Sequence, residues 1–291
     1  MHQIKQGIYY EDIYLGVTLG ALVYPNGTIL IDAPLRSEDA RSWRSALMSL
    51  RGGTNRVMIS LDSHLDRTLG ARLMECTIIS HQKTAQVYRN RPLIFKGQTI
   101  ESGADWETYN DVIGTRWASP DITFTDQMTL HWGSAEVVLE HHPGPTPGAI
   151  WALIPEEKIA FIGDAVVPNQ PPFLDNAELD VWLETLDLLY TSYKDYLIVS
   201  GRDGIITRED IRAQANHLKK IARQIDRLAA KHASPEMTED LIPKLLSDFS
   251  FPPEYYERYA QRLRAGLYQF YNRQFHPQNP IEQSEIEINL D

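Results

Sequence analysis

The sequence has a single cysteine, Cys76, and no long apolar stretch. One cysteine excludes a disulfide within the chain and any Cys-x-x-Cys metal site. No segment approaches the roughly 20 consecutive apolar residues that a membrane helix requires. Residues 1–5 contain no apolar run of the signal-peptide kind. We therefore expect a cytoplasmic protein that has no membrane partner.

Positive charge is also scarce in this chain. Its 28 Lys and Arg residues face 39 Asp and Glu residues, which gives a formal net charge of −11. A field of that sign opposes phosphate backbones and anionic membrane surfaces, so we expect no nucleic-acid partner. Hydrophobic residues make up 43% of the chain and charged ones 23%, which is typical of a globular protein. At 291 residues, the chain is long enough for one large α/β domain or two smaller ones.

Ionisable residues are concentrated directly after one apolar run. Residues 57–61 read as a buried strand, residues 62–67 contain four ionisable side chains, and residues 69–74 are again mostly apolar. This pattern predicts a strand, a polar loop and the start of a helix. Because α/β proteins place their chemistry where a strand leads into a helix N-terminus, we expect the functional site here.

Strands and helices alternate around this stretch. Residues 17–24 and 28–31 are apolar runs joined by a Pro-Asn-Gly turn, and Asp32 is expected to cap the end of the second. A helix is expected to begin at Ser37. Four further strands are expected at residues 128–132, 135–140, 149–154 and 158–162. Such alternation is typical of an α/β fold.

The C-terminal part is predicted to be helical. Thr207 and Asp210 form a capping-box pattern at the start of a long helix. A later helix carries an apolar stripe, which we interpret as core or as a homodimer contact: Leu263, Leu267, Phe270 and Tyr271. We expect a first domain at residues 1–205, a helical extension at 206–276 and a flexible tail at 277–291.

Four segments together resemble the metallo-β-lactamase superfamily. Residues 62–70, DSHLDRTLG, resemble the family's H-x-H-x-D-H-x-x-G; residues 142–148 resemble its P-G-H-T-P-G turn; and residues 161–164 resemble its F-x-G-D. Residues 200–204 fall where the family carries G-H-G. The resemblance covers about residues 1–205. It implies a four-layer αββα sandwich of the metallo-β-lactamase type, to which the C-terminal helical extension would be added.

The metal ligands of the family are only partly present. The resemblance implies two metal ions, most often zinc, held by five histidines and two aspartates. Three of the seven positions keep the family residue: His64, Asp66 and Asp164. The other four hold Asp62, Arg67, Pro145 and Arg202. Proline has no ligand atom and arginine has no lone pair to offer, so we expect the dinuclear site to be largely lost.

One metal site could remain. Asp62, His64 and Asp164 could hold one divalent ion (zinc, iron or manganese) or none, since three protein ligands and a water suffice for catalytic zinc. At the second site, we expect the guanidiniums of Arg67 and Arg202 to replace the ion and pair with carboxylates.

Two functions follow from this degenerate site, and the sequence leaves open whether the protein is an enzyme. The first is a non-hydrolytic or metal-free member that binds a small anionic ligand in the former active-site cleft, with Arg67, Arg202 and His142 as ligand-binding residues. The alternative is a mononuclear metal-dependent hydrolase acting on an ester, thioester, lactone or phosphoester. In that case Asp66 and His64 would perform the acid–base chemistry.

Overall fold

The computed structural model describes residues 1–50, 52–97 and 101–276, so the expected tail at 277–291 lies outside the described residues. Two sheets form the body of the molecule. The first contains seven strands in sequence order: β1 (His2–Lys5), β2 (Ile8–Glu11), β3 (Leu19–Tyr24), β4 (Gly27–Ile31), β5 (Asn55–Ile59), β6 (Thr77–His81) and β7 (Ile122–Phe124). The second has the order β13-β12-β11-β10-β9-β8. Its strands are β8 (Gln127–Leu130), β9 (Val137–His141), β10 (Ile150–Ile154), β11 (Ile159–Phe161), β12 (Leu197–Ser200) and β13 (Gly204–Ile206).

The direction of the strands decides where loops meet. Strands β4 to β7 are parallel to one another, whereas β1 to β4 form an antiparallel meander. In the second sheet only β11 and β12 are parallel. Parallel neighbours end at the same edge of their sheet, so the residues that follow β4 and β5 lie together, as do those that follow β11 and β12.

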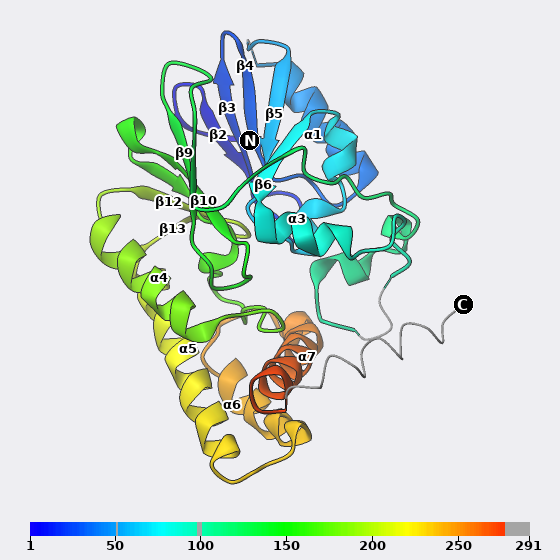
Figure 1. Ribbon diagram of the computed structural model, residues 1–291, viewed down its shortest axis with the longest axis vertical. Helices are drawn as coiled ribbons and strands as arrows, with labels where there is room; N and C mark the ends of the chain where they lie inside the picture. Colours follow the sequence, from blue (N-terminus) through cyan, green and yellow to red (C-terminus); the bar gives the residue numbers. More distant parts are fainter. Residues whose placement is uncertain (51, 98–100, 277–291) are drawn as a thin grey trace.

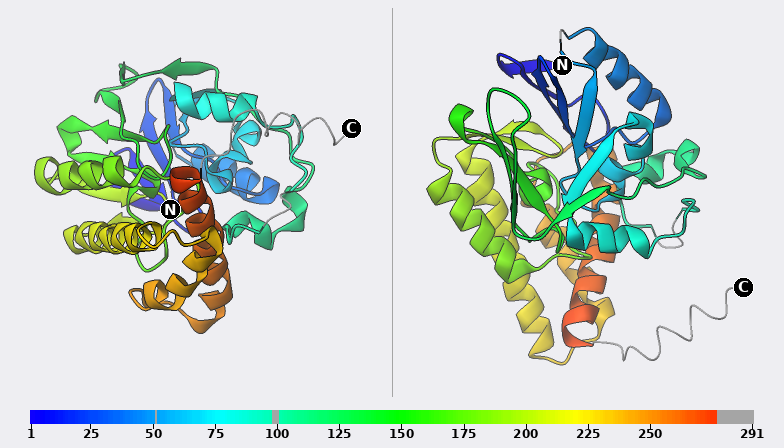
Figure 2. Two further views of the ribbon diagram at one scale, coloured as in Figure 1. Left: turned by 60° about the horizontal axis from the view of Figure 1, so that its bottom comes forward. Right: turned by 45° about the horizontal axis from the view of Figure 1, so that its top comes forward.

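The two sheets pack face to face with helices on both outer sides (Figures 1 and 2). Their inner faces form one core, which includes Ile29, Ile59, Leu139 and Phe161. Helix α1 (Ser37–Met48) covers the first sheet with Trp43, which is fully buried. Helices α4 (Leu179–Ser192) and α5 (Arg208–Ala229) cover the second. The predicted four-layer αββα sandwich is therefore confirmed.

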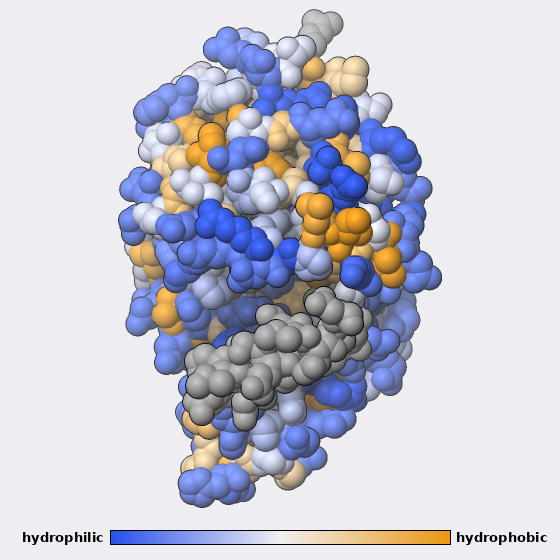
Figure 3. All heavy atoms as spheres, turned by 45° about the vertical axis from the view of Figure 1, so that its right-hand side comes forward, coloured by the Kyte–Doolittle hydropathy of each residue, from blue (hydrophilic) through white to orange (hydrophobic). Residues whose placement is uncertain are grey.

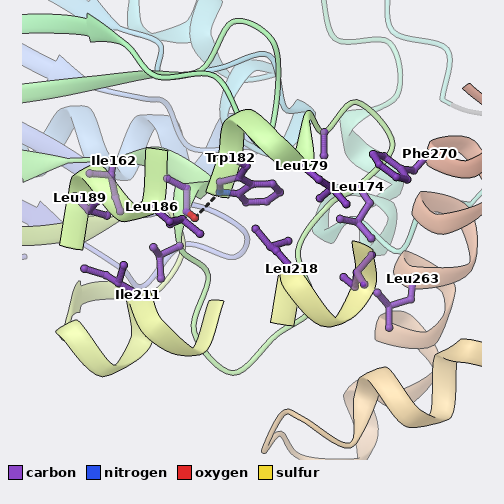
Figure 4. Packing of buried hydrophobic residues seen from close by; sticks show 14 of the residues in the cluster. Ile162, Leu174, Leu179, Trp182, Leu186, Leu189, Ile211, Leu218, Leu263 and Phe270 are labelled. Carbon is purple, nitrogen blue, oxygen red and sulfur yellow. Dashed lines mark hydrogen bonds between the residues drawn. The ribbon is translucent and has the colours of Figure 1, made fainter. Parts of the chain in front are cut away.

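The C-terminal helices share a core with the second sheet. The cap of α5 forms as predicted: Asp210 N donates to Thr207 Oγ1 (3.3 Å), and Thr207 N donates to the Asp210 carboxylate (2.7 Å). Figure 4 shows side chains of α4, α5 and α7 (Tyr256–Phe275) packed around one cluster, which α6 (Ile242–Leu246) also joins. The predicted stripe of α7 is buried there: Leu263, Leu267, Phe270 and Tyr271. The homodimer and the domain boundary at residue 205 stay predictions.

No helix in the described part of the chain combines the length and apolar character that a membrane crossing requires.

Between α3 (Gln82–Arg89) and β7, the described residues 90–97 and 101–121 are held by aromatic packing. Phe95, Trp106 and Trp117 form a buried cluster with Phe173. Trp106 and Phe173 of this cluster contact Asp66 and Arg202, respectively.

Candidate functional site

Charged residues from four strand ends meet between the two sheets' loop edges. Asp32 follows β4, Asp62 follows β5, Asp164 follows β11 and Arg202 follows β12. All four side chains are almost fully buried, with 0–8% of each residue exposed. The parallel pairing of β4 with β5 and of β11 with β12 accounts for this convergence.

The short helix α2 (Leu65–Thr68) supplies the remaining predicted residues. His64 is its N-cap, and Asp66 and Arg67 lie in its single turn. Successive residues of a helix point roughly 100° apart, so Asp66 and Arg67 face different partners. Asp66 accepts a hydrogen bond from Trp106 N (2.8 Å), whereas Arg67 points toward the strand ends.

The Arg67 guanidinium contacts three carboxylates. Nη1 donates to Asp32 (2.8 Å), Nη2 donates to Asp164, and Nε lies 3.1 Å from Asp62 Oδ1. The Arg67 side chain is 0% exposed. Gly201 makes room for it, since a Cβ at that position would lie 2.6 Å from Nη1. Arg67 is therefore an internal cation enclosed by the site.

The Arg202 guanidinium binds a second set of carboxylates and shares one with Arg67. Nε donates to Asp164 Oδ2 (3.0 Å), and Nη1 donates to Asp66 (3.0 Å) and to Asp105 (2.9 Å). Its side chain is 1% exposed, and its guanidinium lies 4.6 Å from the centre of the Phe173 ring. Asp164 thus bridges two arginines.

His64 completes the group from the cavity side. Its Nδ1 lies 2.9 Å from Asp62 Oδ2 and 3.2 Å from Asp164 Oδ2, so it donates its proton to this carboxylate pair. Burial would lower the pKa of His64, but the charges of Asp62 and Asp164 outweigh it and raise the pKa. The imidazolium form is favoured as a result.

The buried carboxyl groups of the site differ in the direction of their pKa shifts. For Asp164, burial raises the pKa, but Arg202 and Arg67 outweigh it and hold the pKa below its usual range. Asp62 has a lowered pKa for the same reason, through Arg67 and His64. For Asp32, burial dominates over the Arg67 charge and raises the pKa to about 7. The two carboxylates that lie between cations are thus the most firmly ionised.

The sequence did not reveal the part played by the helical extension. Asp105, which accepts a hydrogen bond from Arg202, also accepts one from Arg258 Nη1 (2.6 Å). Its carboxylate lies 3.5 Å from Arg262 Nη2. Both of these arginines belong to α7. A usable signal was the position of Arg262 next to Leu263 on the apolar face of a predicted helix, because an arginine there needs a buried partner. Asp32, expected as a cap, was likewise not assigned to the site.

A cavity of about 620 Å³ adjoins this charged group. His64 and Asp66 lie in its wall, together with Trp106, Phe173 and part of α7. The buried guanidiniums of Arg67 and Arg202 stand behind that wall and face carboxylates. Their predicted ligand-binding role stays a prediction.

The structure does not bring His142 to this group. Its Nε2 lies 2.9 Å from Glu140, and its ring stacks on Trp151 at 3.8 Å, toward the outer helical layer. The predicted site residues that do converge are Asp62, His64, Asp66, Arg67, Asp164 and Arg202. The assignment of His142 to a ligand likewise stays a prediction.

The donor atoms of this group suit one metal ion and not two. One ligand atom each from Asp62, His64 and Asp164 lies within 4.8 Å of the others, which suits a single ion by number. A second ion beside this group does not fit, because it would lie next to the guanidiniums of Arg67 and Arg202, which pair with the same carboxylates and have no lone pair to offer. Two unit charges 4 Å apart interact by roughly 4 kcal/mol at an effective dielectric of 20, so guanidiniums oppose a nearby cation. The residues present do not fit a pair of ions.

Comparison with known proteins agrees with this fold. A family model described as the metallo-beta-lactamase superfamily matches residues 71–202. No curated protein matches the sequence.

Solved structures resemble the chain more extensively. The sec-alkylsulfatase Pisa1 from Pseudomonas sp. is 15% identical with a TM-score of 0.70 over 99% of this chain and 51% of that chain. A metallo-beta-lactamase family protein from Thermus thermophilus is 17% identical with a TM-score of 0.64, covering 94% of this chain and 95% of that one. A metallo-beta-lactamase from Pontibacter korlensis is 17% identical with a TM-score of 0.55, covering 75% and 97%. The chain spans about half the length of the sulfatase, and likeness at these identities concerns the fold.

Proposed function

Because this chain belongs to the metallo-beta-lactamase superfamily, we propose that it is a non-hydrolytic or metal-free member that binds a small anionic ligand in the cavity beside His64. The superfamily usually binds zinc or other divalent metals, and the solved structures that resemble this chain include metallo-beta-lactamases and a sulfatase.

The observation that carries the proposal is the pairing of Asp164 with two guanidiniums. Arg67 binds one oxygen of this carboxylate and Arg202 binds the other. A carboxylate can bridge two metal ions only if its oxygens are free to coordinate them. Charge-assisted hydrogen bonds from arginine neutralise it internally, so the site is held together without ions.

The cavity supports the choice of a small anionic ligand. Its volume of about 620 Å³ lies within the range of small-molecule sites. Basic side chains outnumber acidic ones in its wall: His64, Arg91 and Arg262 lie there with Asp66 and Asp175, and Asp66 is paired with Arg202. Low-dielectric walls with an excess of one sign of charge attract ligands of the opposite sign.

Metal content tests the proposal directly. We expect protein purified without chelator to contain less than one equivalent of zinc, iron and manganese together, as measured by elemental analysis. Its thermal unfolding should be unchanged by added chelator, because arginines and not ions neutralise the carboxylates. Two equivalents that a chelator removes would contradict the proposal.

The second candidate is a mononuclear hydrolase, which the close grouping of Asp62, His64 and Asp164 favours. A bound ion would activate a water for attack on an ester, thioester, lactone or phosphoester. His64 and Asp66 would then hold or transfer protons at the cavity wall. One bound equivalent, with hydrolysis that is lost in both chelator and the Asp164→Asn variant, would favour this candidate over the first.

A further inference from the structure

Arg91 is a partly buried arginine in the wall of the same cavity. It follows α3, and its Nη2 donates to the Ser63 carbonyl at 2.7 Å. Its guanidinium lies 4.5 Å from the centre of the Trp117 ring and 5.1 Å from that of Tyr88. One backbone bond and two aromatic faces thus hold its orientation.

Arg91 differs from the other arginines at the site because it has no ion-pair partner in the described part of the chain. Arg67 contacts three carboxylates within 4.0 Å, whereas none of the described residues offers one to Arg91. Its Nη1 is buried and has no hydrogen-bond partner among those same residues. Burial lowers the pKa of Arg91, and its neighbours Tyr88 and Asp62 oppose this shift. A largely buried guanidinium without an ion-pair partner is unfavourable, so this position suits an anion supplied by a ligand.

The rest of the wall is suited to an apolar body. Leu65, Val87, Trp106, Phe173, Leu174 and Ala265 line the cavity. Of the carboxylates in the described wall, Asp66 is bound by Arg202 and Trp106 N, and Asp175 accepts from Asn176 (2.7 Å). A ligand with one anionic end and a hydrocarbon portion would find both kinds of contact.

We propose that Arg91 is the anchor for the anionic group of the ligand, and that the ligand is an amphipathic organic anion whose hydrocarbon part lies against Val87, Trp106 and Phe173. This inference rests on the proposed ligand-binding function and adds its chemical class and its anchoring residue. A carboxylate, a sulfonate and a phosphate share the oxyanion chemistry that a guanidinium recognises.

Calorimetric titration with simple probes tests the ligand class. The probes are hexanoate, hexanesulfonate and hexyl phosphate, with hexanamide as the neutral analogue and acetate as the short one. We expect the three hexyl anions to bind at least tenfold more tightly than hexanamide. Acetate should bind more weakly than hexanoate by about fourfold for each missing methylene that becomes buried. The order among the three anions identifies the preferred oxyanion.

Variants test the anchor. Arg91→Gln should weaken binding of all three anions by at least tenfold and leave hexanamide unchanged. Arg89→Gln is the matched control, since it removes the same charge from an exposed position at the end of α3 and should change nothing. Arg91→Lys keeps the positive charge but loses the planar guanidinium that can donate two hydrogen bonds to one oxyanion. It should weaken anion binding by several-fold. This variant decides the question if Arg91→Gln fails to fold by circular dichroism.

The possible results distinguish a failure of the Arg91 anchor from a failure of the proposed ligand-binding function. Anion binding that is unchanged in Arg91→Gln would overturn the anchor and leave anion binding in place. Equal binding of hexanamide and hexanoate would overturn ionic recognition. If the parent protein binds no probe, the ligand class is wrong, while the metal analysis still decides on its own whether the protein uses ions.

Discussion

An arginine and a metal ion hold carboxylates in different ways. A guanidinium spreads one charge over a planar fork, whereas a divalent ion gathers lone pairs around a point. Arg202 uses its fork across Asp66, Asp105 and Asp164. Arginine is also permanently charged, so this arrangement neutralises the carboxylates at any pH at which the protein folds. Stability at this site would then be independent of metal supply.

Removing Arg202 should destabilise the protein strongly. Arg202→Ala leaves three buried carboxylates without their shared cation, and breaking a buried ion pair typically costs about 3–5 kcal/mol. We expect a loss of this size in the free energy of unfolding, measured with denaturant. The exposed Arg212, which contacts Tyr190, provides the control: Arg212→Ala should cost about 1 kcal/mol or less.

Coupling between Arg202 and its partner gives a sharper measurement. Asp164→Asn removes the charge that Arg202 would strand, so the double variant should be more stable than the sum of the two single changes predicts. Additive effects, or an Arg202→Ala protein within about 1 kcal/mol of the parent, would show that the pairing contributes little.

At the scale of elements, helix α7 is part of the site as well as of the core. Its Arg258 and Arg262 reach Asp105, and Arg262 also donates to the carbonyl of Gly103 (3.1 Å). The segment that carries Gly103 and Asp105 therefore lies directly against the helix. The site and the C-terminal extension should lose their order together.

A glycine substitution can test this contact between segment and helix. Gly103 has a φ of +68°, and a Cβ there would lie 2.4 Å from the carbonyl oxygen of Arg258 and 2.5 Å from Arg262 N. Gly114 has a φ of +90° with nothing within 4 Å, so it shares the backbone strain but lacks the clash. Gly103→Ala should lower the unfolding free energy by about 1–3 kcal/mol more than Gly114→Ala.

Hydrogen exchange identifies where the effect of that substitution falls. In Gly103→Ala, amide protection should decrease in α7 and around Asp105, because the backbone of the segment must move away from the helix. Equal effects of the two alanine substitutions would mean that backbone conformation alone is responsible and that α7 is not held at this point.

How far the sequence could predict the site depends on the element that carries each residue. Asp62, His64 and Asp164 follow apolar runs that form strands, so local patterning and the family motifs placed them. Asp105 lies in an irregular segment without hydrophobic periodicity, and its partner Arg258 is 153 positions away. Pairing over that distance depends on tertiary packing, which no local pattern encodes.

At the scale of the whole molecule, the chain is acidic overall and also buries several carboxylates in one site. The chain carries a net charge of −11, and Figure 3 shows a face on which hydrophilic residues predominate. Five buried carboxylates gather at the site: Asp32, Asp62, Asp66, Asp105 and Asp164. The fold accommodates them through cations from both sheets' loops and from α7. Replacing those arginine cations with metal ions therefore tests how the fold neutralises its buried carboxylates.

Restoring the family's ligands should make the protein depend on metal. The quadruple variant contains Asp62→His, Arg67→His, Pro145→His and Arg202→His, on a frame that keeps His64, Asp66 and Asp164. It removes two guanidiniums and one carboxylate, so the remaining acidic groups lose internal neutralisation. Position 145 directly precedes Thr146 and Pro147, which lie in the cavity wall. Two divalent ions would then suit the donors.

We expect elemental analysis to find about two equivalents of zinc in the folded quadruple variant, and chelator to lower its melting temperature. Hydrolysis of generic esters or lactones should stay feeble, because groups that orient metal-bound histidines contribute roughly 10–100-fold to affinity or activity.

The double variant Asp62→His with Pro145→His is the matched control: it adds two imidazoles but retains Arg67 and Arg202, so it should not gain a second ion. A folded quadruple variant that takes up no more metal than the parent would mean that these four positions do not correspond to the family's ligands. Uptake of two ions by the double variant would mean instead that the arginines do not exclude them.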